Sequence, residues 1–79
     1  MEQIEVTTRF QGDGSLTPIE FSAAGSTVKV KDVGRQWDTE DGRHVLVMDR
    51  QSKVYHLLFQ LSDLNWYWIK DIKPASNRV

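Results

Sequence analysis

Residues 54–73, VYHLLFQL, then SDLN, then WYWIKDIK, decide the fold of this 79-residue chain. They contain five of its eight aromatic residues, so much of the core energy sits here. Two runs rich in β-branched and aromatic residues, separated by a short polar turn, are typical of a β-hairpin. A helix over residues 61–73 is the alternative, because Leu61, Leu64, Trp68 and Ile72 fall at helical spacing. We prefer the strand, since WYWI is strand-like and the segment contains no Ala, Arg or Glu.

Turn lengths predict which side chains share a face of the sheet. With Gln51-Ser52 as a two-residue loop, Met48 faces Tyr55, and with residues 62–65 as a four-residue loop, Phe59 faces Trp68. The predicted core face is Leu46, Met48, Tyr55, Leu57, Phe59, Leu61, Trp66, Trp68 and Ile72. The opposite face carries Val45, Val47, Val54, His56, Leu58, Tyr67 and Ile69. Soluble monomers rarely expose such an apolar face, so either the first two strands cover it or it is an interface.

Period-2 alternation predicts further strands at residues 4–10, 16–22, 27–37 and 44–48. The alternation changes phase between Val30 and Val33, which predicts a bulge or sharp bend near Asp32. Six strands spaced roughly 8 to 12 residues apart are typical of an all-β sandwich or barrel. We therefore predict an all-β fold, a small antiparallel meander of about six strands closed into an SH3-like barrel. Residues 1–73 form its single domain, and residues 74–79 are expected to be a flexible tail.

Composition favours a small soluble domain in the cytoplasm. The chain contains no cysteine, which fits a reducing compartment. No apolar run approaches the roughly 20 residues of a membrane span, and the N-terminus, MEQIE, is acidic, so we expect neither secretion nor membrane insertion. Ten Lys and Arg against eleven Asp and Glu give a net charge of -1, whereas a duplex DNA-binding domain is usually basic.

The residues that could form a catalytic or metal-binding site do not have the spacing that such a site requires. In the predicted register His44 and His56 lie roughly 10 Å or more apart on opposite faces, too far to share a zinc ion. His56 falls opposite Asp71 with no nucleophile beside it, which favours a structural pair. The acidic turn at residues 38–42 misses the spacing of a calcium loop, and the glycines at residues 12–14 lack the Lys-Ser/Thr pair of a phosphate loop. We expect a non-enzymatic protein without a cofactor.

Four motifs, taken in order, resemble a group of short, uncharacterised bacterial proteins. They are VKVKDVGRQW at residues 28–37, GRH at 42–44, VYHL at 54–57 and WYW at 66–68, and they cover about the last 50 residues. In that group a valine-rich strand ends in Arg-x-Trp, a Gly-Arg turn follows, and two strands with Tyr and Trp come after it. The resemblance implies an SH3-like or similar small barrel and brings no activity, cofactor or catalytic residue.

Three hypotheses about function remain. The first is a non-catalytic protein-interaction module or homodimer whose surface is Val45, Val47, His56, Leu58, Tyr67 and Ile69. The second is single-stranded nucleic-acid binding, against which the negative charge weighs. Its candidate contacts are Lys29, Lys31, Arg35, Trp37 and Arg43, with Tyr67 and Lys70 as further contributors. The third is a small-ligand barrel, which requires a concave apolar pocket with a few convergent polar groups.

Overall fold

The computed structural model describes residues 2–23 and 25–70, which form seven β-strands. The strands are β1 (Glu2–Phe10), β2 (Leu16–Ala23), β3 (Ser26–Lys29), β4 (Asp32–Thr39), β5 (Gly42–Met48), β6 (Val54–Gln60) and β7 (Asn65–Ile69). All pairings are antiparallel, in the order β3-β2-β1-β7-β6-β5-β4, so the predicted all-β antiparallel fold is confirmed. Within the two described ranges, no helix is long and apolar enough to cross a membrane.

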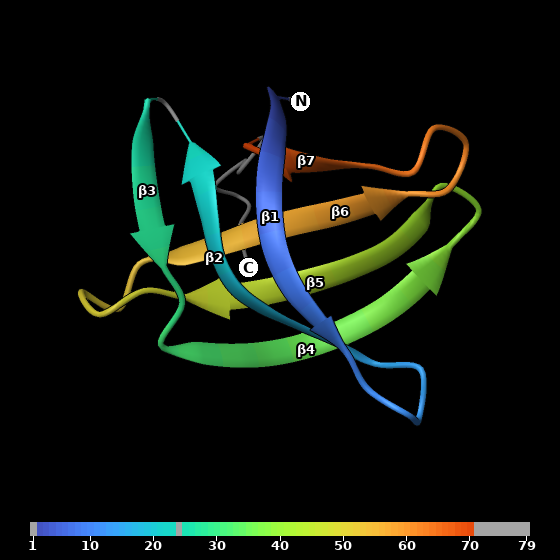
Figure 1. Cartoon of the computed structure of the whole chain (residues 1–79), viewed down its shortest axis with the longest axis horizontal. Helices are drawn as coiled ribbons and strands as arrows, with labels where there is room; N and C mark the ends of the chain where they lie inside the picture. Colours follow the sequence, from blue (N-terminus) through green and yellow to red (C-terminus); the bar gives the residue numbers. More distant parts are fainter. Residues whose placement is uncertain (1, 24, 71–79) are drawn as a thin grey trace, which may run out of the picture.

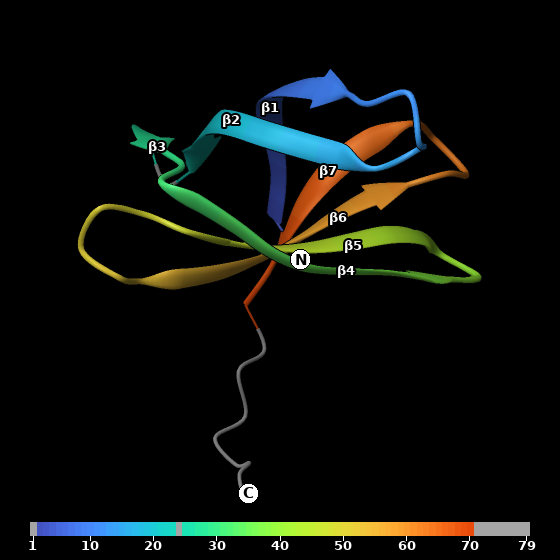
Figure 2. The same ribbon diagram turned by 90° about the horizontal axis from the view of Figure 1, so that it is seen from below.

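The sheet curls into a half-barrel with two layers. β1, β2 and β3 lie across one side of the molecule, β4, β5 and β6 form the other side, and β7 joins them (Figures 1 and 2). The register of β1 with β2 shifts between Thr7 and Thr8, and the register of β4 with β5 shifts between Val33 and Gln36. Such irregularities bend a strand and increase its twist, which allows a small sheet to curl.

The bend expected near Asp32 is present, and it divides the predicted strand at residues 27–37 into β3 and β4. Between them, the Val30 N–H donates to the Ile19 carbonyl on β2 (2.9 Å), and the Lys31 N–H donates to the Met48 carbonyl on β5 (2.8 Å). The chain therefore steps from one edge of the curled sheet to the other within two residues. This step raises the strand count from the six that we expected to seven.

The core lies between the two layers. Phe21 on β2 meets Tyr55 on β6 edge to face, with ring centroids 5.1 Å apart, and this contact joins the layers. The buried cluster is Ile4, Leu16, Phe21, Ala23, Val45, Val47, Tyr55, Leu57 and Trp66, with Phe59 and Trp68 packed against it. Full burial of a side chain of this size contributes roughly 1.5 to 3 kcal/mol, so this cluster is the main source of stability.

The predicted register of β5 with β6 is wrong by one residue. Val47 pairs with Tyr55 and Val45 with Leu57, so the two valines face the core, while Leu46 and Met48 face outward. The cause is Asp49, whose carboxylate accepts the N–H groups of Gln51 (2.8 Å) and Lys53 (3.0 Å). The connection is therefore residues 49–53 rather than a two-residue loop, and a one-residue slip moves every β5 side chain to the other face.

The strand predicted at residues 66–73 is present as β7 (Asn65–Ile69) within the described residues, and its register differs from the prediction by two residues. Phe59 pairs with Trp66 because the four-residue turn is residues 61–64 rather than 62–65. A slip of two preserves the faces, so the predicted core positions on β6 and β7 hold. Leu61 is the exception, because it lies in the turn and is 58% exposed. Ile72, Asp71 and the predicted tail at residues 74–79 lie outside the described residues.

Candidate functional site

Two surfaces of the half-barrel are candidates for a functional site. The first is the outer face of β4 to β7, which points away from the core. His56, Leu58, Tyr67 and Ile69 lie on it, as expected for the predicted interaction surface. Val45 and Val47 do not, because the register slip places both in the core, where they are 0% and 2% exposed. Leu46 and Met48 take their places.

The two histidines lie side by side on this outer face, and the expected separation of 10 Å or more is wrong. His44 Nδ1 is 2.8 Å from His56 Nε2, and the ring centroids are 5.0 Å apart. In the observed register His44 pairs with Leu58 and Leu46 pairs with His56, so the histidines are diagonal neighbours on one face. The same one-residue slip explains both this error and the exchange of Val45 and Val47.

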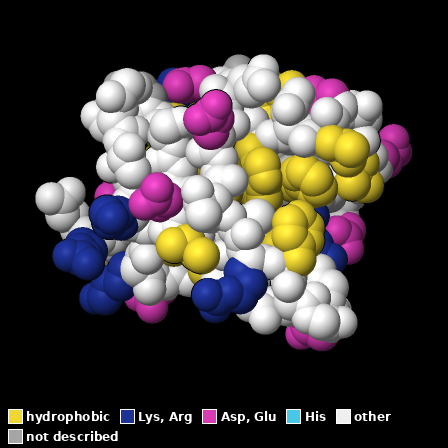
Figure 3. All heavy atoms as spheres, viewed as in Figure 1, with side chains coloured by type: hydrophobic (Ala, Val, Ile, Leu, Met, Phe, Trp, Pro, Cys, Tyr) yellow, Lys and Arg dark blue, Asp and Glu magenta, His cyan; other side chains and the backbone are white. Residues whose placement is uncertain are grey.

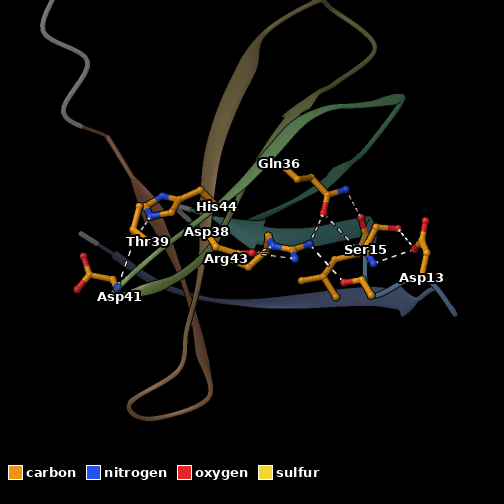
Figure 4. Close-up of polar contacts among 10 residues, drawn as sticks. Asp13, Ser15, Gln36, Asp38, Thr39, Asp41, Arg43 and His44 are labelled. Atoms are coloured by element: carbon orange, nitrogen blue, oxygen red, sulfur yellow. Dashed lines mark hydrogen bonds and ion pairs between the residues drawn. The ribbon is translucent and has the colours of Figure 1, made fainter.

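Side chains of β4 hold the His44 ring in place. Trp37 stacks on it with a centroid distance of 5.0 Å and an interplanar angle of 6°. Thr39 Oγ1 lies 2.9 Å from His44 Nε2 and also accepts the Asp41 N–H at 3.2 Å (Figure 4). His44 is buried with both ring nitrogens in hydrogen bonds. We call Trp37, Thr39, His44 and His56 the histidine cluster.

Two proton arrangements satisfy the histidine cluster. In one, His44 Nε2–H donates to Thr39 and His56 Nε2–H donates to His44 Nδ1. In the other, the Thr39 hydroxyl donates to His44 Nε2, and His44 Nδ1–H donates to His56 Nε2. Either way, the two facing nitrogens share one proton, and one of them presents a lone pair. The cluster is therefore suited to hold a proton, or another electron-pair acceptor, between two imidazoles.

The nucleic-acid candidates divide into two groups. Lys29 ends β3, Lys31 lies in the connection to β4, and Arg35 and Trp37 lie on β4. The Arg35 guanidinium lies 5.0 Å from the centre of the Trp37 ring. Arg43 is elsewhere: its Nε donates to Asp38 Oδ1 at 2.6 Å and its Nη1 to the Gly14 carbonyl at 3.3 Å (Figure 4). The other two candidates are engaged as well, Tyr67 with Asp63 and Lys70 with Glu2.

Arg43 instead connects the two layers of the half-barrel. Its Nη1 donates to Gln36 Oε1 at 3.1 Å, and Gln36 in turn accepts the Leu16 N–H and donates to the Leu16 carbonyl. The hydrogen bond from Arg43 lowers the pKa of Asp38, and the same contact raises the pKa of Arg43. Arg43 is therefore structural, with its charge matched by Asp38.

The second surface is the open side of the half-barrel, which separates β1 from the β6–β7 turn. β1 pairs with β7 only from Glu2 to Ile4, so the rest of β1 borders no strand of the described sheet on that side. The surface exposes Phe10 (66%), Leu61 (58%) and Leu64 (65%), three of the five exposed large hydrophobic side chains in the described ranges. Hydrophobic side chains gather here between the end of β1 and the β6–β7 turn (Figure 3).

The open side is hollowed as well as apolar. Phe10 meets Phe59 edge to face there, with ring centroids 6.4 Å apart. A second hollow, near β3, is larger at about 400 Å³, but polar and charged side chains form most of its lining. The hollow at the open side has a volume of about 210 Å³. Its lining residues are Phe10, Gly14, Leu16, Asp38, Arg43, Phe59 and Leu61. We use the name open side for Phe10, Phe59 and Leu61, which line this hollow, together with the exposed Leu64 in the same turn as Leu61.

The β6–β7 turn holds its two leucines in a defined conformation. The Leu64 N–H donates to the Gln60 carbonyl (2.8 Å), and Asp63 accepts the Asn65 N–H (3.0 Å) and the Tyr67 hydroxyl. The hydrogen bond from Tyr67 lowers the pKa of Asp63 and raises that of Tyr67. Leu64 has a φ of 58°, a left-handed conformation that is costly for a bulky side chain.

Sequence reasoning missed both the histidine cluster and the open side. The signal for the cluster was Asp49, since an Asp that opens a polar turn can accept backbone N–H groups and lengthen the loop. The signal for the open side was weaker, because Leu61 and Leu64 look like core residues by hydrophobicity alone. Residues 2–23 and 25–70 contain no group of three or more His, Cys, Asp or Glu side chains arranged to hold a metal ion.

Comparison with known proteins gives no match to a protein-family model, to a curated protein or to a solved structure. The resemblance to the bacterial group therefore stays an expectation.

Proposed function

We propose that this protein is a non-catalytic protein-interaction module of the cytoplasm, built on an SH3-like small barrel, and that it binds a partner at the open side. The observation that carries the proposal is Leu64. It is 65% exposed and it adopts a left-handed backbone conformation, so it contributes little burial and adds strain. Strain of this kind costs of order 1 to 3 kcal/mol and gathers at functional sites.

The open side also has the character of an interface core. Phe10 and Leu61 come from two separate elements and line a hollow that can accept an apolar side chain of a partner, and Leu64 lies in the same turn as Leu61. Exposed apolar patches rimmed by polar groups mark interaction sites, and Arg43 and Asp38 supply such a rim. The partner that fits is a protein segment with an apolar anchor residue, extended enough to lie beside the unpaired part of β1.

The outer face is a weaker candidate for the interface. Leu58 is 1% exposed there, and Leu46, Met48, Tyr67 and Ile69 are only partly exposed. Nucleic-acid binding has less support too, because Trp37 is already covered by His44 and Arg35 and because Arg43 is paired with Asp38. A small-ligand barrel has less support since the space between the layers is filled by the core cluster.

The test compares two substitutions of the same kind. Leu64→Asn and Ser52→Asn both place Asn at a left-handed position, since Ser52 has a φ of 66° in the β5–β6 turn, yet only Leu64 belongs to the open side. Peptides selected from a random displayed library on the wild-type protein provide the probe, and their Kd is measured for each variant. We expect Leu64→Asn to weaken binding roughly tenfold or more, the range of an interface hot spot, and Ser52→Asn to leave it unchanged.

Equal affinities for wild type and Leu64→Asn would overturn the proposed surface. A library that yields no saturable binder would also count against it, since an interaction module should select peptides. If the chain forms a dimer in sedimentation experiments and the selected peptides dissociate it, the partner at the open side is a second copy of the chain.

A further inference from the structure

We propose that His44 and His56 form a binding site for a divalent transition-metal ion of tetragonal or square-planar preference, Cu²⁺ first. The inference starts from the facing nitrogens, His44 Nδ1 and His56 Nε2, which are 2.8 Å apart. Imidazole nitrogens bind such ions at about 2.0 to 2.1 Å, so two of them at a right angle around one ion lie about 2.9 Å apart. The observed separation is already close to that value.

The same geometry selects among metals. A tetrahedral ion such as Zn²⁺ holds two nitrogens about 3.3 to 3.4 Å apart, which requires the rings to separate by roughly half an ångström. Cu²⁺ and Ni²⁺ accept nitrogens at right angles with water in the remaining positions. Cu²⁺ also has the highest affinity for nitrogen ligands in the first-row series. We therefore expect affinity to fall in the order Cu²⁺, Ni²⁺, Zn²⁺. The difference in affinity between Ni²⁺ and Zn²⁺ should be larger than the affinity series alone would give.

The surrounding side chains hold the His44 ring in place. Trp37 stacks on His44, and Thr39 accepts the Nε2–H in one of the two proton arrangements, which directs the lone pair of Nδ1 toward His56. A hydrogen bond at the far nitrogen of this kind fixes the tautomer of metal-binding histidines. When the ion binds, each facing nitrogen presents its lone pair, so the proton that the two nitrogens share is released to solvent and each neutral ring carries its proton on the other nitrogen. Both rings then turn slightly, so that the two lone pairs meet on an ion beside the line that joins the nitrogens.

This chain makes the experiment unusually clean, because His44 and His56 are its only two histidines and it has no cysteine. A bound Cu²⁺ would also lie next to Trp37, whose ring centroid is 5.0 Å from that of His44. Copper quenches a neighbouring indole, whereas Trp66 and Trp68 face the other side of the sheet. Trp37 fluorescence thus reports occupancy directly.

The test titrates the full chain separately with Cu²⁺, Ni²⁺ and Zn²⁺, with tryptophan fluorescence and, for Cu²⁺, electron paramagnetic resonance as readouts. We expect saturable quenching and a spectrum with two coordinated nitrogens. His56→Gln keeps a hydrogen-bond donor beside His44 but removes the second ligand, so Cu²⁺ affinity should fall roughly tenfold or more. Trp37→Phe should abolish the quenching and preserve the two-nitrogen spectrum, and Tyr67→Phe, on the same face, should change neither.

Three results would overturn the site. They are no saturable binding at millimolar Cu²⁺, a spectrum without paired nitrogens, and an affinity of His56→Gln equal to that of the wild type. The last result would mean that carboxylates elsewhere hold the copper and that the two histidines serve only as a hydrogen-bonded pair.

Discussion

Gly42, at the start of β5, has no side chain because the β6 backbone occupies the space that one would need. A Cβ atom on Gly42 would lie 2.0 Å from the Phe59 carbonyl oxygen, and the φ of 149° is strained for any other residue. Gly34 in β4 is different, since its Cβ would make an ordinary 3.6 Å contact with the Leu46 carbonyl. We predict that Gly42→Ala destabilises the fold by roughly 3 kcal/mol and Gly34→Ala by less than about 0.5 kcal/mol.

Urea denaturation followed by circular dichroism measures both values. Gly34→Ala is the matched control, because it makes the same chemical change in the paired strand β4. Similar midpoints for the two variants would show that the β5 and β6 backbones are not as close at Gly42 as the structure has them.

Leu64 and Ser52 are the two residues other than glycine with a positive φ in the described chain. Asn tolerates the left-handed conformation better than either residue does. We therefore predict that Leu64→Asn and Ser52→Asn each raise the free energy of unfolding by about 0.5 to 1 kcal/mol. Thermal denaturation checks this, with Gln51→Asn as a turn variant outside the left-handed region. A loss of stability in Leu64→Asn would mean that Leu64 serves the fold, which would remove the main support for the open-side interface.

At the scale of elements, the β6–β7 hairpin was predictable and the β5–β6 connection was not. WYWI and VYHLLF carry their own alternation, so even a register error of two residues left Tyr55, Phe59 and Trp66 on the core face. β5 is apolar on both faces, HVLVM, so its pattern cannot say which side is buried, and only the loop length decides. The two histidines meet only because the β5–β6 connection has five residues, and Leu61 is exposed only because the β6–β7 turn begins at residue 61. Both sites therefore lay beyond what hydrophobic periodicity specifies.

The loop between β5 and β6 depends on the charge of Asp49. Backbone hydrogen bonds from Lys53 and Gln51, together with the Tyr55 hydroxyl, lower the pKa of Asp49 below its ordinary 3.8. A lowered folded-state pKa means that the carboxylate stabilises the fold above pH 3.8, and that this contribution is lost as the pH falls through the folded-state value. We predict that Asp49→Asn lowers stability at pH 7 and flattens the acid limb of the stability curve.

Chemical denaturation between pH 2 and 7, about the range over which a carboxylate titrates, tests this prediction. Glu40→Gln is the control, because Glu40 lies in a turn without a hydrogen bond or ion pair among the described residues. An acid limb that is as steep in Asp49→Asn as in the wild type would assign the acid sensitivity to other carboxylates, Asp38 and Asp63 first.

At the scale of the whole molecule, the half-barrel separates two kinds of surface. β1 leaves β7 after Ile4 and opens an apolar side, whereas the outer face of β4 to β7 holds the imidazoles and the indole of the histidine cluster. The open side offers exposed apolar side chains with a charged rim, while the histidine cluster offers lone pairs. A partner segment and a metal ion would therefore bind at separate places and respond to different substitutions.

The charge of the whole molecule gives the last prediction. Neither oligo-dT nor oligo-U should change the tryptophan fluorescence at low or moderate salt. The net charge of -1 gives no long-range attraction to phosphates, and Trp37 is already stacked on His44 beneath Arg35. Lys29→Glu with Lys31→Glu provides the comparison, since these lysines lie on the same run of chain as Trp37. Quenching of the wild type that is reversed by salt and lost in the double variant would make the protein a single-strand binder, with β3 and β4 rather than the open side as its working surface.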